Sequence, residues 1–475
     1  MATTDDGIRG SRRSTRGGSG ATGLFGRNFT PMTVAEIVEA VTVPPLPFRV
    51  EAFDGSSTGP ADTPLKIRLT SPHALAYIVT APGDLGLARA YITGELRIDG
   101  ESPAHPYSMF DALQTFYYES FRKPSAATLV RIARSLRALG GVHLMPAPPQ
   151  EELPGWRKAL LEGLSRHSKE RDKESVSRHY DVGNDFYELV LGDSMAYTCA
   201  YYPDEGTGPG GAWNPADWPK GSAVHDGLTA AQENKHRLIF DKLKLSEGDR
   251  LLDVGCGWAG MVCYAARHGV KAVGVTLSRE QYEWGARRIR EEGLEDLAEV
   301  RCMDYRDVKE EGFDAVSAIG ILEHIGLDNY EDYFSRLYAK LRPGGRMLNH
   351  CITRPTNERV KTGQFIDRYI FPDGELTGSG TIISTMQDVG FDVVHAENLR
   401  FHYQRTLHDW CELLAENWDA ATELVGEPTA RLFGLYMAGS EWGFEHNVVQ
   451  LHQVLGVKLH EGGAANLPVH QWWRA

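Results

Sequence analysis

Short apolar runs and helical segments alternate from Arg250 onward, and few folds are compatible with this alternation. Strands are predicted at residues 250–254, 271–275, 298–302, 313–318 and 346–351. Helices are predicted between them, at residues 259–268, 278–292 and 330–341. Strands that alternate with helices pair in parallel, so this order predicts an α/β fold, a mostly parallel, doubly wound, Rossmann-like sheet with helices on both faces.

A glycine-rich turn follows the first of these strands. Gly255, Gly257 and Gly260 match the spacing G-x-G-x-x-G, which lets a backbone approach a ligand closely at a helix N-terminus. Asp253 ends the strand just before the turn, where its carboxylate can pair with a cationic amino group such as that of S-adenosylmethionine. A nicotinamide site instead expects an acidic residue at the end of the next strand, and none occurs before Glu280. A nicotinamide oxidoreductase stays open as the alternative.

The chain is too long, at 475 residues, for one compact core, so two domains are expected. Residues 1–28 are rich in Gly, Ser, Thr and Arg and are predicted to be disordered. A small α+β domain is predicted over 29–145, with helices near 34–41, 85–91 and 124–140 and strands at 48–50, 65–69 and 76–79. A proline-rich linker and a basic helical segment cover 146–178, and the catalytic domain covers 179–475 with an irregular insertion at 204–225.

Composition excludes several classes of protein. The six cysteines, which form no CxxC pair, predict neither a disulfide framework nor a zinc site, and they favour a reducing cytoplasm. The net charge of -14 argues against a nucleic-acid partner. No secretory signal and no bilayer-spanning apolar run is found.

Several other residues are ambiguous by pattern alone. Glu323 lies at the carboxyl end of the fourth strand, where an acid or base and a helix cap are equally good interpretations. His350, Cys199 and Tyr403 taken singly are typical of structural positions. The aromatic residues after 364 can line an apolar tunnel or form an ordinary core, and the basic tract 122–178 can meet anionic headgroups or be a solvated face.

Six stretches in order resemble the cyclopropane fatty acid synthase family, which includes the mycolic acid cyclopropane synthases. The resemblance covers roughly residues 170–455. The matching stretches are 179–187, 197–201, the glycine turn with 274–281, 304–307, 322–326 and 369–374. The region before the linker resembles the amino-terminal domain of phospholipid-acting members, more weakly.

The resemblance implies roles for individual residues. The positions that hold S-adenosylmethionine in the family are Tyr197, Thr198, Gly255, Gly257, Thr276, Leu277 and Gln281, with Asp304 and Tyr305 at the adenine. Asp253, placed at the end of the strand before the glycine turn, is expected to join them. Positions that hold a bicarbonate ion, the expected base, are Cys199, Glu323, His350, Ile352 and Tyr403. No metal is implied. Ala259 stands where a glycine is common, and its methyl is expected to be tolerated while tightening the cofactor pocket.

The implied activity is methyl transfer to the double bond of an unsaturated phospholipid acyl chain through a carbocation. The product is a cyclopropane or, as in some actinobacterial relatives, a 10-methylene chain, which a reductase partner then reduces. The enzyme would work in the cytoplasm, peripheral to the inner face of the membrane, and the sequence allows a homodimer. The alternatives are a methyltransferase of another small molecule and a non-catalytic lipid-binding protein.

Overall fold

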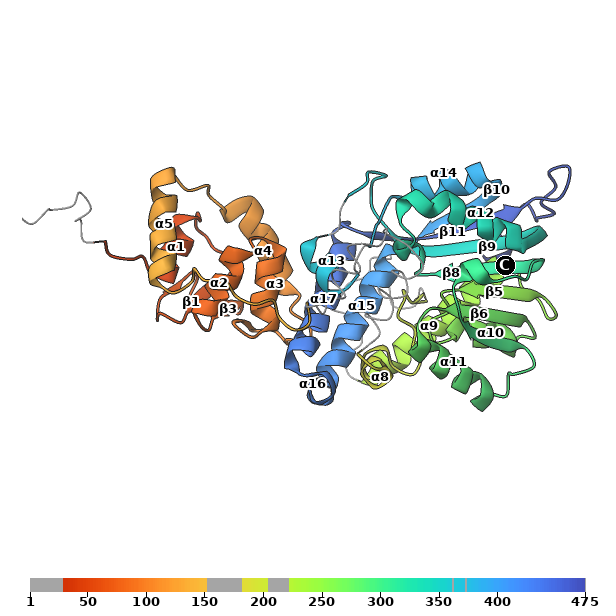
Figure 1. The fold of residues 1–475 in the computed structure, drawn as a ribbon, viewed down its shortest axis with the longest axis horizontal. Coiled ribbons are helices and arrows are strands. Elements are labelled where there is room, and N and C mark those ends of the chain that lie inside the picture. The colour runs from red at the N-terminus through yellow and green to blue at the C-terminus, as the bar shows by residue number, and fades with distance from the viewer. Residues whose placement is uncertain (1–28, 152–181, 204–221, 361–362, 372–373, 475) are drawn as a thin grey trace, which may run out of the picture.

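The computed structural model describes residues 29–151, 182–203, 222–360, 363–371 and 374–474. An N-terminal α+β region, residues 29–151, lies at one end of the molecule and a large sheet lies at the other (Figure 1). Between them stand the helices α13 (Gln364–Tyr369), α15 (Arg400–Glu416), α16 (Trp418–Val425) and α17 (Glu427–Glu445). The predicted tail at 1–28 and residues 152–178 of the predicted linker and basic helical segment lie outside the described residues.

The N-terminal region has a sheet of its own, in the order β2-β1-β3-β4. Its strands are β1 (Arg49–Ala52), β2 (Ser57–Thr58), β3 (Lys66–Leu69) and β4 (Leu96–Asp99). The helices are α1 (Val34–Ala40), α2 (Pro72–Thr80), α3 (Asp84–Ile92), α4 (Ser108–Thr115), a π-helical turn (Phe116–Ser120) and α5 (Ala126–Ala138). The strand predicted at 76–79 is wrong: Ser71 accepts a hydrogen bond from the backbone N–H of His73 and Pro72 occupies the first turn, so α2 begins there and includes 76–79.

The large sheet has seven strands in the order β10-β11-β9-β8-β5-β6-β7. Its bounds are β5 (Arg250–Val254), β6 (Lys271–Thr276), β7 (Ala298–Cys302), β8 (Phe313–Ile319), β9 (Leu341–Thr353), β10 (Phe391–Asn398) and β11 (Gln450–Lys458). The five strands from β5 to β9 pair in parallel, as the alternating pattern predicted. The antiparallel strands β10 and β11, which were not predicted, extend the β9 edge.

Helices cover both faces of this sheet, which confirms the doubly wound architecture. One face packs against α9 (Ser222–Lys242), α10 (Gly260–Arg267) and α11 (Arg279–Glu291). The other packs against α12 (Tyr330–Lys340) and α14 (Ser379–Val389). The insertion predicted at 204–225 is wrong at its end, because residues 222–225 already belong to α9, while 204–221 lie outside the described residues.

The largest core cluster joins the two ends of the molecule. It includes Leu85 and Tyr91 of α3, Phe186 of α8 (Asn184–Leu191), Trp410 of α15 and Phe433 of α17. The short 3-10 turns Tyr305–Asp307, Leu322–His324, Leu327–Asn329 and Trp472–Arg474 complete the chain. Within the described residues, no helix is both long and apolar enough to cross a bilayer.

Candidate active site

The glycine turn between β5 and α10 brings backbone close to open space at the carboxyl edge of the sheet. Gly255 and Gly257 have φ of +71° and +53°, a region that favours glycine. A Cβ at Gly255 would come within 2.8 Å of Ile321 Cδ1, whereas a Cβ at Gly257 would meet no protein atom within 4 Å. The Trp258 ring nitrogen donates to Asn184 Oδ1 at 2.8 Å, so two of the sequence motifs meet at this turn. A ligand can therefore lie directly against the backbone at Gly257.

Asp253 is a buried carboxylate at the end of β5. It accepts a hydrogen bond from Ser317 Oγ at 2.6 Å and is 2% exposed. Burial raises the pKa of Asp253 to about 6, against the lowering effects of Ser317 and of the Lys235 charge. A cationic group bound in front of Asp253 would compensate this buried charge, as the cofactor interpretation requires.

A cavity of about 210 Å³ opens beside the turn. All ten residues predicted to hold the cofactor line it: Tyr197, Thr198, Asp253, Gly255, Gly257, Thr276, Leu277, Gln281, Asp304 and Tyr305. Thr276 Oγ1 donates to Gln281 Oε1 at 2.8 Å, and the Asp304 carboxylate pairs with Arg306 at 2.6 Å. The residues come from β5 and the glycine turn, from β6, from the segments after β6 and β7, and from the segment between α8 and α9. Their convergence at one sheet edge explains why distant motifs form one pocket.

Lys235 of α9 also lines this cavity, and the sequence analysis missed it. Its ammonium group donates to Thr198 Oγ1 at 2.9 Å and to Gln232 Oε1 at 2.8 Å. Burial lowers the pKa of Lys235 to about 8, although the nearby Cys199 and Asp253 favour the charged form. A lysine on a polar helix carries no sequence signal of burial, so only the fold reveals this residue.

Three of the five residues predicted to hold a small anion line the same cavity, namely Glu323, Ile352 and Tyr403. Glu323 Oε1 accepts the backbone N–H of Ile352 at 2.7 Å, while Oε2 is buried with no hydrogen-bond partner among the described residues. Burial raises the pKa of Glu323 to about 7, even though the Ile352 hydrogen bond lowers it. This carboxyl group can therefore hold or release a proton at neutral pH.

His350 does not line the cavity but lies two residues before Ile352 on the same face of β9. Lys242 Nζ donates to Gln453 Oε1 at 2.7 Å, which fixes the Gln453 amide so that its nitrogen donates to His350 Nδ1 at 3.1 Å. The proton of the neutral ring is then on Nε2, a buried atom without a hydrogen-bond partner among the described residues. Burial lowers the pKa of His350 well below its usual value and keeps the ring neutral.

Cys199 is also absent from the cavity wall. Its fully buried Sγ lies 3.2 Å from the carbonyl oxygen of Ala200 and 3.9 Å from that of Leu399. The same Leu399 carbonyl accepts the backbone N–H of Tyr403 at 3.1 Å. Burial raises the pKa of Cys199 above its usual value, so its thiol stays protonated and supports the start of α15.

Ala259 adopts the left-handed conformation, with φ of +67°, which explains why a glycine suits this position. Its side chain is fully buried, lies outside the cavity wall and faces Gly285, where an added Cβ would come within 3.0 Å of the Ala259 Cβ. The methyl is tolerated, but the expected tightening of the cofactor pocket is wrong because the methyl points away from it.

A second, mostly apolar cavity of about 420 Å³ adjoins the first. The two share six lining residues: Ile352, Ile366, Phe371, Leu376, Tyr403 and Tyr436. Helices α15 and α17 form one wall, and α3 and α4 of the N-terminal region form another through Leu87, Ala88 and Phe110. Five aromatic residues after 364 line this cavity, namely Phe365, Phe371, Tyr403, Tyr436 and Phe444, whereas others such as Trp410 and Phe433 pack in the core. The N-terminal region completes the cavity wall.

Comparisons with known proteins agree with this architecture. The profile of the family described as mycolic acid cyclopropane synthetase matches residues 167–454. A probable fatty acid methyltransferase of Mycobacterium tuberculosis is 50% identical over 93% of this chain and 99% of its own length. The cyclopropane-fatty-acyl-phospholipid synthase of Escherichia coli K12 is 32% identical over 87% of this chain and 91% of its own. A mycolic acid cyclopropane synthase solved with SAH and CTAB has a TM-score of 0.52 and 28% identity, covering 60% of this chain and 98% of that one.

The chain is thus a methyltransferase that depends on S-adenosylmethionine. Within that class it belongs to the cyclopropane fatty acid synthase family. The nicotinamide alternative is excluded by this membership.

Proposed function

We propose that the chain transfers a one-carbon unit from S-adenosylmethionine to the double bond of an unsaturated acyl chain in a phospholipid. The observation that carries this proposal is the meeting of the two cavities at Ile352, Tyr403 and Tyr436. An apolar chain in the larger cavity would present its middle to the ligand in the smaller one. A small polar substrate would gain no binding free energy from so large an apolar surface.

The cofactor would lie against Gly255 and Gly257, with its amino group toward Asp253 and its adenine toward Asp304 and Tyr305. It would supply an electrophilic methyl group. Aromatic and aliphatic side chains, including Phe371 and Tyr436, exclude water from the point where the two cavities join. Exclusion of water protects a cationic intermediate from being quenched by the addition of water.

Bicarbonate would supply the base that takes the proton from this intermediate. The residues fit such an ion because His350 Nε2 offers an N–H donor and Glu323 Oε2 offers an acceptor, and both lack a partner among the described residues. Tyr403 on the cavity wall and backbone groups near Ile352 and Cys199 would complete the cradle. Glu323 would accept a hydrogen bond from such an ion, and His350 would donate one to it.

The N-terminal region supports a membrane substrate. Helix α5 carries exposed Leu129 and Val130 beside exposed Arg131 and Arg134. Apolar and cationic side chains together suit the anionic inner face of a bacterial membrane. We therefore propose that the enzyme works in the cytoplasm, peripheral to that face.

The test is mass spectrometry of membrane lipids from bacteria that express the chain and are fed oleate. The proposal expects phospholipid acyl chains that gain one CH2, and NMR of the product separates a cyclopropane from a methylene branch that a reductase would process. Unchanged acyl chains in cells that contain folded protein would contradict the proposal. Consumption of S-adenosylmethionine on a soluble metabolite instead would favour a small-molecule methyltransferase, and lipid binding without any consumption would favour a lipid-binding protein.

A further inference from the structure

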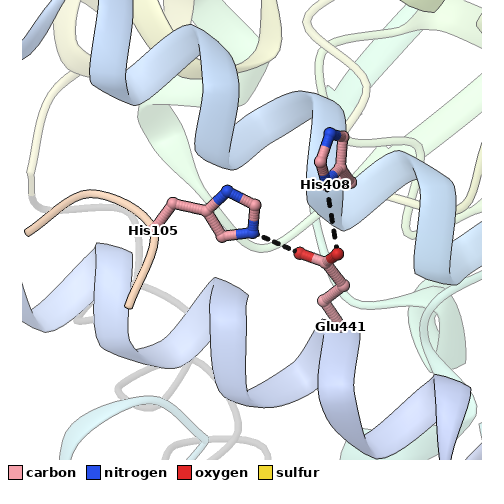
Figure 2. A group of neighbouring side chains, drawn as sticks. All are labelled: His105, His408 and Glu441. Carbon is pink, nitrogen blue, oxygen red and sulfur yellow. Dashed lines mark hydrogen bonds and ion pairs between the residues drawn. The ribbon is translucent and has the colours of Figure 1, made fainter. Parts of the chain in front are cut away.

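Two histidines and a glutamate from distant parts of the chain meet beside the apolar cavity (Figure 2). His105 follows β4 in the N-terminal region, His408 lies on α15 and Glu441 lies on α17. His105 Nε2 is 2.7 Å from Glu441 Oε2, and His408 Nδ1 is 3.2 Å from Glu441 Oε1. One ligand atom from each of the three side chains lies within 4.8 Å of the others. A single ion placed among these atoms could reach all three.

A second carboxylate supports His105 from behind. Glu412 Oε1 is 3.2 Å from His105 Nδ1, the ring nitrogen that faces away from Glu441. A carboxylate on the far nitrogen is the usual way to orient a histidine that binds a metal through the near one. The sequence predicted no zinc site from the spacing of its cysteines, and the family resemblance implied no metal. Neither expectation concerned these histidine and glutamate residues, which lie far apart in the chain.

The cluster is enclosed and carries an excess of negative charge. Glu441 is 2% exposed and His408 is 9% exposed, while the His105 side chain, at 13%, leaves a route from solvent. Two carboxylates and two neutral imidazoles sum to a charge that matches a divalent cation.

We propose that His105, His408 and Glu441 form a binding site for a divalent transition-metal ion, of the class represented by Zn²⁺. Two imidazole nitrogens and a carboxylate oxygen are ligands that zinc prefers, with water free to complete the coordination. The ion replaces the protons now shared between the histidines and Glu441, and these protons leave to solvent.

The site has a structural consequence. Leu407 and Ser440, the neighbours of His408 and Glu441 in the chain, line the apolar cavity. His105 belongs to the region that forms the opposite wall. A metal bound by all three residues would therefore hold the N-terminal region against α15 and α17 and fix the width of the cavity.

Zinc binding by the untagged, chelator-treated full chain tests the proposal. Titration calorimetry and elemental analysis should give about one Zn²⁺ per chain, and Zn²⁺ should raise the melting temperature. His408→Gln should abolish this binding and the thermal shift. The matched control is His73→Gln, an exposed histidine of the N-terminal region whose Nδ1 lies 3.4 Å from Glu95, and it should bind zinc as the wild type does.

Glu412→Gln provides a second variant in case His408→Gln does not fold. It keeps all three ligands and removes the support of His105, so zinc affinity should fall about 10- to 100-fold. Absence of saturable zinc binding by the wild type would overturn the proposal and leave the cluster as an ion-pair network. Equal binding by the wild type and the folded His408 and Glu412 variants would overturn it as well, because the zinc would then lie elsewhere.

Discussion

The Glu323 carboxylate accepts the backbone N–H of Ile352 at 2.7 Å, and its second oxygen is buried without a hydrogen-bond partner in the described part of the chain. The hydrogen bond fixes the carboxyl group in the wall of the cavity that the glycine turn also lines. A buried acceptor without a partner costs free energy, so its presence points to a ligand that satisfies it.

Glu323→Gln should lower turnover by roughly 10²- to 10⁴-fold, because the amide keeps the Ile352 contact but cannot hold a proton donor in the same way. Affinity for S-adenosylhomocysteine, measured by calorimetry, should be unchanged. The matched control is Glu375→Gln, which also accepts a backbone N–H, that of Leu327 at 3.0 Å, but lies outside both cavity walls. Wild-type turnover in Glu323→Gln would refute the assignment.

The same substitution should change how stability depends on pH. Burial raises the pKa of Glu323 from 4.5 to about 7, so the folded state binds the proton more tightly than the unfolded state does. Its contribution to stability is present below about pH 4.5 and is lost as pH rises through about 7, a penalty on the order of 3 kcal/mol. Urea unfolding without ligands should show Glu323→Gln gaining stability relative to the wild type between about pH 5 and pH 8. A difference that does not vary with pH would contradict this.

Gly257→Ala should weaken cofactor binding by roughly tenfold or more, because the added methyl points into space reserved for the ligand. The control is Gly248→Ala, which also has a positive φ, +88°, and no atom within 4 Å, but does not line the pocket. Both variants should lose about 1 kcal/mol of unfolding free energy, and only Gly257→Ala should lose affinity. Equal affinities in the two variants would show that the backbone at Gly257 does not contact the cofactor.

Lys235→Met should make cofactor binding depend on pH. The Lys235 charge lowers the pKa of Asp253, which burial raises to about 6, so its removal should raise that pKa further. Asp253 would then be partly protonated near neutral pH, and affinity should be weak there and recover as pH rises. Lys242→Met is the control, since Lys242 is a buried lysine of α9 that does not line the pocket. A pH profile like that of the wild type would contradict the assigned role.

Ala88→Phe should fill part of the apolar cavity from the N-terminal side. Turnover of phospholipid should fall by roughly tenfold or more while S-adenosylhomocysteine affinity stays the same, because Ala88 lines only the larger cavity. Ala339→Phe, on the exposed face of α12 and outside both cavity walls, should behave as the wild type. Undiminished turnover in a folded Ala88→Phe variant would place the acyl chain elsewhere.

The sequence predicted the five parallel strands of the sheet, because short apolar runs there alternate with segments of helical periodicity. It missed β10 and β11, because β11 pairs antiparallel with β9, which lies about a hundred residues earlier in the chain, and β10 pairs antiparallel with β11. It also took 76–79 for a strand, because Ile78 and Val79 are β-branched, although Ser71 and Pro72 begin a helix there.

The residues of the candidate site that belong to sequence motifs could be predicted, whereas those brought together only by the fold could not. The ten residues predicted to hold the cofactor, nine from the resemblance and Asp253 from its place at the strand end, all line one cavity. No pattern marks Lys235 as buried, and none joins Lys242, Gln453 and His350, which come from three different elements. The contribution of α3 to the apolar cavity depends on how the N-terminal region packs on α17, which no local sequence signal encodes.

The most direct measurement is turnover by purified enzyme on vesicles of dioleoyl phospholipid with S-adenosylmethionine and bicarbonate. Each S-adenosylhomocysteine formed should be matched by one CH2 gained on an oleoyl chain, and Glu323→Gln should slow the formation of both by the same factor. S-adenosylhomocysteine without any CH2 on the lipid, or lipid left unchanged by folded enzyme that binds the cofactor, would contradict the claim that the unsaturated acyl chain is the substrate.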